Sequence, residues 1–212
     1  FDATADYDRA VQDQSDQMLG NALRSFFVAG ALRLLCDSKL LSDVIGRTFN
    51  DRATLKNLCP KPHTMLLHPS ALIDEHVYGA RLIAAWSIGS DQPSVDMGSE
   101  PTDENGWPIL SRDGLRARLA REPDKWRLCW SDFLESWGNL ALSPGSTAPP
   151  DLSQFTWEQI ETTIREEVFE FTRLSVINSH EHADDKPEFT PRSSEDGLWK
   201  APRDLLTIFV SG

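Results

Sequence analysis

The chain has 212 residues, of which 40% are hydrophobic and 25% charged, and its formal net charge is −12 at pH 7. This length and composition fit one globular domain with a sizeable core, and they exclude an intrinsically disordered chain. The excess of acidic residues argues against binding to nucleic acid or to an anionic membrane surface, because both carry negative charge themselves.

The first predicted element is a long helix over residues 5–36. Met18, Ala22 and Phe26 lie on one side of such a helix, and no proline interrupts it. Its longest run without a polar side chain, residues 26–32, is far shorter than the ~20 residues that span a bilayer. We therefore expect no transmembrane helix and no membrane partner.

Three further helices are expected before residue 90. The first runs from about Lys39 to Gly46, the second follows an Asn50 or Asp51 cap and ends before Pro60, and the third begins at Pro69 and ends at Gly89. Proline at a first helical position loses no hydrogen bond, and glycine readily adopts the conformation that ends a helix.

Residues 89–110 form what we name the acidic loop, because they include five acidic residues and none that is basic. Prolines and glycines prevent regular structure in this segment. Long loops inside compact domains are usually either mobile or functional. The acidic loop is thus either a mobile connection or the best candidate for a lid or a partner-binding segment.

A short basic helix is expected after the loop, capped by Ser111 and containing the only cationic cluster of the sequence: Arg112, Arg116, Arg118 and Arg121. These arginines could bind an acidic partner or a phosphate. Alternatively they balance the acidic loop and form helical pairs such as Arg118 with Glu122.

A tryptophan-rich helix follows, with Pro123 at its start and Gly138 as its expected C-terminal cap. Steps of three and four residues place its large apolar side chains on one side: Trp126, Cys129, Trp130, Phe133 and Trp137. We expect this helix to be a core element. Three indoles are more than such a stripe needs. The candidates for contact with a ligand in an aromatic cavity are therefore Trp126, Trp130 and Trp137, together with Tyr78.

The clearest helix start is at Thr156, which forms a predicted capping box with Gln159. The apolar stripe continues to about Asn178, with Glu161 and Arg165 as a supporting ion pair. Residues 180–203 are polar and contain prolines, and residues 204–210 could form a strand or a last helical turn that docks on the core.

These elements predict an all-α fold, a single-domain irregular bundle of about six or seven helices with long polar loops. Residues 1–179 would form the helical domain and residues 180–212 a mostly irregular C-terminal extension. Three widely spaced cysteines without a C-x-x-C pair suggest free thiols and a cytoplasmic protein. The chain opens with Phe1, however, which leaves room for a removed targeting sequence.

Catalytic signatures of nucleotide-binding, hydrolase, zincin and kinase sites are absent from the sequence. One remaining hypothesis is that Glu167 or Glu170 lies inward beside His76 and forms an acid–base or metal site. Another is a metal site at His180 and His182, whose neighbours are acidic. A partly buried histidine and a solvated helix terminus are the simpler interpretations, and the sequence indicates no particular cofactor.

Two classes of function stay open. The first is a non-catalytic helical interaction or regulatory domain that binds a protein partner through the acidic loop or an exposed groove beside the tryptophan helix. The second is a small helical enzyme or ligand-binding protein that holds a small apolar ligand in an aromatic cavity. The sequence does not indicate an oligomeric state.

Overall fold

The structure is a computed structural model that describes residues 3–68, 73–93, 96, 98–141, 150–177 and 186–211. It is 53% helical and 14% strand, with two sheets of three strands each. The fold is therefore mixed α/β, and the prediction of an all-α bundle is wrong.

The helical elements are α1 (Ala3–Asp37), α2 (Arg52–Leu58), α3 (Ile73–Ser87), α4 (Arg112–Arg121), α5 (Pro123–Ala141), η1 (Leu152–Gln154), α6 (Trp157–Thr163), the π-helical turn η2 (Ile164–Val168) and α7 (Phe169–Phe171). The strands are β1 (Thr48–Phe49), β2 (His63–Leu67), β3 (Arg173–Ile177), β4 (Arg192–Ser193), β5 (Trp199–Lys200) and β6 (Leu206–Ser211).

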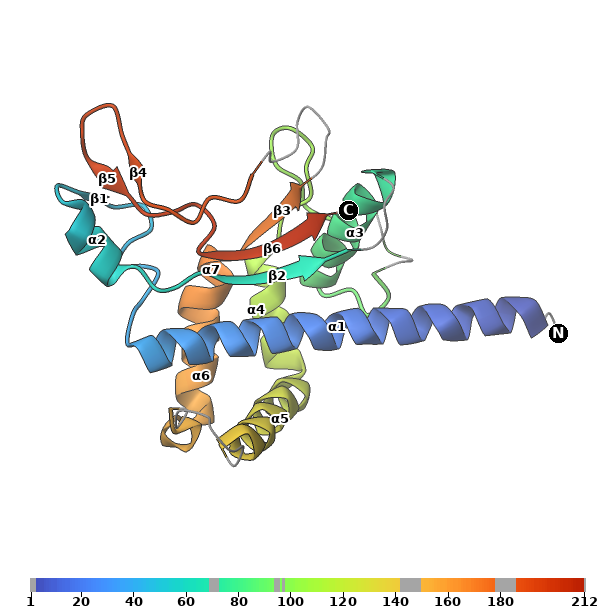
Figure 1. The fold of residues 1–212 in the computed structure, drawn as a ribbon. Coiled ribbons are helices and arrows are strands. Elements are labelled where there is room, and N and C mark those ends of the chain that lie inside the picture. Colours follow the sequence, from blue (N-terminus) through green and yellow to red (C-terminus); the bar gives the residue numbers. More distant parts are fainter. Residues whose placement is uncertain are drawn as a thin grey trace.

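The larger sheet is parallel and has the strand order β2, β6, β3 (Figure 1). In the central strand β6, Leu206 pairs with His63 of β2, and Thr207 pairs with Arg173 of β3. Every residue of 206–210 is buried, as expected for a parallel strand covered on both faces. α3 packs on β3 and β6, and α1 packs against β2.

The smaller sheet is antiparallel, with the order β1, β5, β4. It lies beside α2, and Arg52 of that helix stacks on Trp199 with its guanidinium carbon 5.1 Å from the ring centre. In Figure 1 this small unit lies to one side of the larger sheet, beyond the start of β2 and β6.

The sequence prediction is wrong at two strands of the larger sheet and at one short helix. The helix expected to continue to Asn178 ends at Phe171, and residues 173–177 form β3. The helix expected from Lys39 to Gly46 is a series of turns. Residues 204–210, expected as a strand or a helical turn in a C-terminal extension, include most of the central strand β6.

Several local predictions are confirmed. Asp51 caps α2, Ser111 caps α4, and Thr156 forms the expected capping box with Gln159 at the start of α6. α5 begins at Pro123, but it continues through Gly138 to Ala141, so the predicted C-terminal cap at Gly138 is wrong.

Four aromatic side chains form the centre of the core, where α1 crosses α3, α5 and α7. Phe27, Trp86, Trp126 and Phe169 have ring centres between 5.2 and 6.4 Å apart. All four are at most 2% exposed. Buried aromatic groups of this size contribute strongly to stability through both area and ring contacts, so α1 is the helix around which the others pack.

α1 is much longer than the core that it crosses. Figure 1 shows its first turns extending past the other elements. By length and composition the stretch Ala10–Asp37 could cross a membrane, and 56% of its most apolar window is buried inside the protein, as in an ordinary core helix. The prediction of no membrane partner stays a prediction.

Candidate functional site

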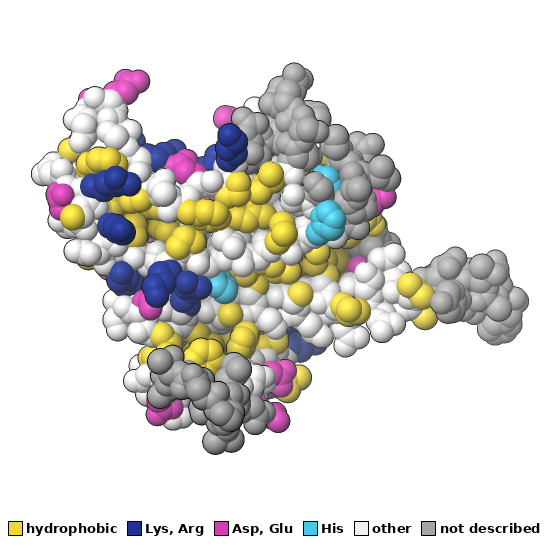
Figure 2. All heavy atoms as spheres, in the orientation of Figure 1, with side chains coloured by type: hydrophobic (Ala, Val, Ile, Leu, Met, Phe, Trp, Pro, Cys, Tyr) yellow, Lys and Arg dark blue, Asp and Glu magenta, His cyan; other side chains and the backbone are white. Residues whose placement is uncertain are grey.

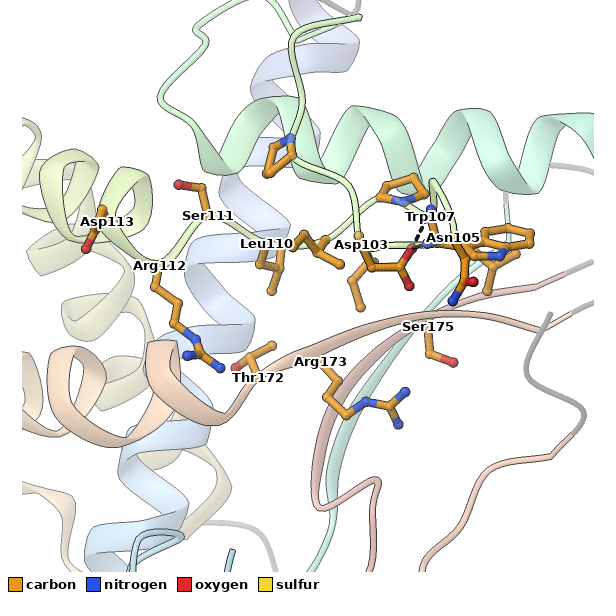
Figure 3. A pocket seen from close by; sticks show the side chains of 15 residues that line it. Asp103, Asn105, Trp107, Leu110, Ser111, Arg112, Asp113, Thr172, Arg173 and Ser175 are labelled. Atoms are coloured by element: carbon orange, nitrogen blue, oxygen red, sulfur yellow. Dashed lines mark hydrogen bonds between the residues drawn. The ribbon is translucent and has the colours of Figure 1, made fainter. Parts of the chain in front are cut away.

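A concavity of about 770 Å³ lies between the acidic loop, the first turn of α4 and the strand β3. We name it the β3 groove (Figure 3). Its lining residues are Pro101, Asp103, Asn105, 107–113 and 172–176. The acidic loop, expected as a lid or partner-binding segment, thus supplies one wall.

β3 forms the opposite wall. Among the described residues it is an edge strand, because the sheet order is β2, β6, β3. Four consecutive residues of this five-residue strand, 173–176, line the groove, although successive side chains of a strand point to opposite faces of the sheet. The groove therefore runs along the edge of β3 and not over one of its faces.

The wall supplied by the acidic loop is a tight turn organised by Asp103. Its carboxylate accepts hydrogen bonds from the backbone N–H groups of Asn105 and Trp107, each at 2.9 Å. The Asp103 N–H donates to the Trp107 carbonyl at 2.8 Å, and Thr102 bridges to Pro108. Asp103 therefore acts as a turn-forming residue, with its Oδ1 engaged by two N–H groups of the loop itself.

Another carboxylate of the acidic loop, Glu100, is bound by Arg81 of α3 and by the Gly98 N–H. Burial raises its pKa, but these hydrogen bonds and the charge of Arg81 outweigh that effect, and the pKa lies below its ordinary value. The loop is thus held to α3 by an ion pair.

The helix α4 supplies positive charge to the β3 groove. Arg112 and Arg116 both bind the Glu170 carboxylate at 2.9 Å. The Arg112 side chain is 56% exposed, and Figure 3 shows it pointing from α4 toward Thr172 at the start of β3. Because it is exposed and shares one carboxylate with a second arginine, this guanidinium can still bind an acidic group.

Farther along α4, Arg118 belongs to a buried network that borders a second concavity of about 300 Å³. Its guanidinium binds Glu122 at 3.1 Å and Asp91 at 3.3 Å, and donates to the carbonyls of Trp86 and Ser90. Glu122 also accepts a hydrogen bond of 2.5 Å from Arg24 of α1.

The ring of Trp86 lies against both arginines of this network. The Arg118 and Arg24 guanidinium carbons are 4.5 and 5.6 Å from its ring centre. Burial raises the pKa of Glu122, but the hydrogen bond from Arg24 and the charges of Arg118 and Lys125 outweigh burial and lower it. The predicted pair of Arg118 with Glu122 is confirmed, and the contacts of Arg118 and Arg121 with Asp91 fit the expectation that the arginines balance the acidic loop.

The three predicted acid–base residues have different surroundings. His76 is 2% exposed on α3. Glu167, in the π-helical turn, accepts hydrogen bonds from the Leu41 and Ser42 N–H groups at 2.7 and 3.0 Å, and from the Ser42 hydroxyl at 2.5 Å. Glu170 binds the two arginines of α4. Glu167 and Glu170 therefore hold elements together, and their role as acids or bases stays a prediction.

The predicted aromatic ligand residues lie mostly in the core. Trp126 is fully buried, Trp130 is 8% exposed, and Trp137 is half-buried with its indole N–H donating to the Pro150 carbonyl at 2.7 Å. Neither the β3 groove nor the concavity beside Arg118 is lined by these three residues. Tyr78, by contrast, is 41% exposed and lines an apolar groove on α3.

His180 and His182, the predicted metal ligands, lie outside the described residues. Within the part of the chain that the structure describes, no group of three or more His, Cys, Asp or Glu side chains could hold a metal ion. The metal hypothesis therefore depends on residues of which the structure says nothing.

Sequence reasoning missed the part of the groove that β3 contributes. Thr172, Arg173 and Ser175 follow a helical stripe without a break, so they were assigned to a helix. The signal available in the sequence was the β-branched content of the run RLSVI, which favours a strand only once the preceding helix is known to end.

No protein-family model, curated protein or solved structure matches this chain.

Proposed function

We propose that the protein is a non-catalytic interaction domain that binds an extended segment of a partner protein in the β3 groove. The observation that carries this proposal is that consecutive residues of an edge strand all line the groove. An extended peptide can add to such an edge through backbone hydrogen bonds while its alternate side chains enter pockets.

The lining indicates which side chains the peptide would present. Trp107, Ile109 and Leu174 offer apolar contacts, and Ile109 is 39% exposed. Arg112 offers a cation at the α4 end of the groove. We therefore expect the preferred segment to combine a large apolar residue with an acidic residue nearby.

The test is selection from a library of random peptides displayed on phage, followed by titration of selected peptides against variants. Ile109→Glu should weaken binding at least ~10-fold, because it introduces a charge into an apolar contact. Ile88→Glu is the matched control, since Ile88 is 37% exposed and does not line the groove.

Arg112→Glu should reduce the binding of acidic peptides in particular. Peptides that bind the Ile109→Glu and Ile88→Glu variants equally well would contradict the proposal, and so would a selection that yields no binder.

A small anionic ligand is the second candidate for the same groove. A volume of about 770 Å³ lies in the range of ligand pockets, and the N-terminus of α4 adds to the charge of Arg112. A thermal-shift screen with small carboxylates and phosphates separates this candidate from peptide binding, because a ligand of the folded protein raises Tm progressively as its free concentration exceeds its Kd.

A further inference from the structure

We infer that a second surface, independent of the β3 groove, binds an acidic segment of a partner protein. This surface lies around α2 and the C-terminal end of α1, where Figure 2 shows Lys and Arg side chains gathered. We name it the basic face and define it by its cations: Arg33, Lys39, Arg52, Lys56 and Lys61.

The charge of the chain is distributed unevenly along the sequence. Residues 33–61 contain six basic and three acidic residues, whereas the other 183 residues contain 15 basic and 30 acidic ones. This segment is therefore positive in a protein whose formal net charge is −12. An acidic molecule is repelled by most of the surface and attracted by this part of it.

The fold brings three of the cations to the end of one short helix. Lys39 follows α1, and its Nζ donates to the carbonyl of Cys59, the C-terminal cap of α2, at 3.0 Å. Lys56 lies in the last turn of α2, and Lys61 is two residues beyond Cys59. Lysines at a helix C-terminus also interact favourably with the helix dipole, so they are stable there without a carboxylate.

The two arginines extend this group. Arg52 lies one turn before Lys56 on α2, and its stacking on Trp199 holds the guanidinium beside the helix. Arg33 lies near the start of β2: burial lowers the pKa of His63, and the nearby charge of Arg33 lowers it further. The basic face therefore combines α1, α2 and the segment that leads into β2.

The cations of the basic face are not neutralised by carboxylates. Among the residues that the structure describes, none of the five forms an ion pair, and Arg52, Lys56 and Lys61 are exposed. Of the other fifteen basic residues with described side chains, twelve form ion pairs. The charge of the basic face is thus available to a partner, unlike most cationic charge of the protein.

Two neighbouring carboxylates are engaged locally. Asp51 accepts hydrogen bonds from the Ala53 and Thr54 N–H groups at the start of α2, at 3.2 and 2.7 Å. Asp43 lies 3.9 Å from Arg47, which is not one of the five cations. These carboxylates leave the positive excess of the basic face in place.

Exposed apolar side chains accompany the charge. Leu40 follows Lys39 in the sequence and is 40% exposed, and Leu58 is the last residue of α2 and is 42% exposed. Protein interfaces combine apolar contacts with a polar and charged rim. A segment that carries a large apolar residue among its carboxylates would therefore fit better than a purely acidic one.

Charge and size decide between the occupants. A nucleic acid or an anionic membrane extends beyond the basic face and meets the rest of the surface, where acidic residues are twice as numerous as basic ones. A second copy of this chain brings its own net charge of −12. A short acidic segment can end where the basic face ends, and at physiological salt charges farther away than about 8 Å are largely screened.

The test is fluorescence anisotropy of a labelled peptide of aspartate, glutamate and leucine, titrated with the full chain. The peptide should bind saturably at about 50 mM salt, and its affinity should fall as salt is added, because exposed charges are screened. A peptide with the same pattern of asparagine, glutamine and leucine should not bind.

Variants show whether the basic face is the binding site. Lys61→Glu should weaken binding of the acidic peptide at least ~10-fold, because a repulsion replaces an attraction, and Lys61→Gln should have a smaller effect. Arg127→Glu is the matched control: Arg127 is exposed on α5, forms no ion pair among the described residues, and its substitution changes the net charge equally. Circular dichroism shows that each variant is folded.

Equal losses in Lys61→Glu and Arg127→Glu would overturn the inference, as would the absence of saturable binding. So would tighter binding of a single-stranded oligonucleotide or of anionic vesicles, if Lys61→Glu abolishes it. Dimerisation in analytical ultracentrifugation that Lys61→Glu abolishes would replace the partner by a second copy.

The β3 groove is separated from the basic face by Arg112→Glu, which should leave binding of this peptide unchanged. Binding that is lost in Arg112→Glu and kept in Lys61→Glu would assign the peptide to the β3 groove and overturn the inference. Failure of the phage selection at the β3 groove has no bearing on Lys61, so the two proposals are tested separately.

Discussion

Arg112 and Arg118 lie six positions apart on α4, and the structure uses them in opposite ways. The Arg118 side chain is 1% exposed, and its donors are taken up by two carboxylates and two backbone carbonyls. The Arg112 side chain is 56% exposed and shares Glu170 with a second arginine. The Arg118 guanidinium is part of the core, and the Arg112 guanidinium lies at the edge of the β3 groove.

The difference shows that cationic charge in this sequence does not by itself indicate function. A buried charge is tolerated only when it is paired and hydrogen-bonded, and it then contributes to the specificity of the fold. An exposed charge contributes little to stability. Arg112 can therefore take part in binding with little effect on the stability of the fold, whereas loss of Arg118 destabilises the fold.

The largest effect is expected for Arg118→Ala. The substitution leaves the carbonyls of Trp86 and Ser90 without their donor, removes one of the cations that pair with Glu122 and Asp91, and removes the contact with the Trp86 ring, so the free energy of unfolding should fall by about 3–5 kcal/mol. Urea denaturation measures it. Arg112→Ala on the same helix should lower the free energy of unfolding by less than ~1 kcal/mol. Equal losses for the two variants would contradict the contrast between the two arginines.

A smaller loss is expected for Gly114→Ala, between the two arginines. A Cβ at this position would lie 2.7 Å from the Ile88 Cα and closer still to the Ser87 carbonyl oxygen. The backbones of α3 and α4 would have to separate, at a net cost of about 1–3 kcal/mol. Ala117→Ser, at an exposed position of α4, should leave the denaturation midpoint nearly unchanged.

His63 shows a third arrangement, because this half-buried group has no carboxylate partner in the part of the chain that the structure describes. It stacks on Phe26 with ring centres 4.7 Å apart, and its Nε2 lies 2.9 Å from the Phe26 carbonyl oxygen. Burial lowers its pKa, the contact with the Phe26 carbonyl opposes this, and the charge of Arg33 lowers it further.

Stability should therefore decline gradually as pH falls below about 6.5, since the unfolded chain binds the proton more readily than the folded one. Denaturation curves at several pH values between ~7.5 and ~5 measure the decline. The His63→Phe variant should show a flatter dependence in this range. An unchanged slope in the variant would assign the decline to other groups.

The smallest effect is expected for Glu170→Gln. This carboxylate is 34% exposed and binds Arg112 and Arg116, which are themselves partly exposed. Its neutralisation should change the free energy of unfolding by less than ~1 kcal/mol, while it frees Arg112 to bind acidic peptides more tightly. A loss of unfolding free energy as large as that of Arg118→Ala would show that the pair of Arg112 with Glu170 stabilises the fold as Arg118 does.

The sequence predicted what depends on neighbours along the chain. Ser111 caps α4 and Thr156 pairs with Gln159 because a cap involves residues three positions apart. The pair of Arg118 with Glu122 follows from helical spacing alone.

Contacts between distant segments could not be found in the same way. β2 is a short run between prolines, and it becomes a strand only because β6 is available as a partner. β3 continues the apolar pattern of the helix before it, so periodicity alone gave no boundary at Thr172. The β3 groove depends on this strand, so the sequence indicates the acidic loop as a candidate lid or partner-binding segment and does not indicate the strand opposite it.

The strand order also constrains how the chain can acquire its structure during synthesis. β2 and β3 do not pair with each other, and each has β6 as its neighbour in the larger sheet. A ribosome must therefore release residues 206–211 before either of the earlier strands has a place to bind. Until then His63–Leu67 and Arg173–Ile177 lack their strand partner, and unpaired strand segments of this kind favour non-native association of a nascent chain.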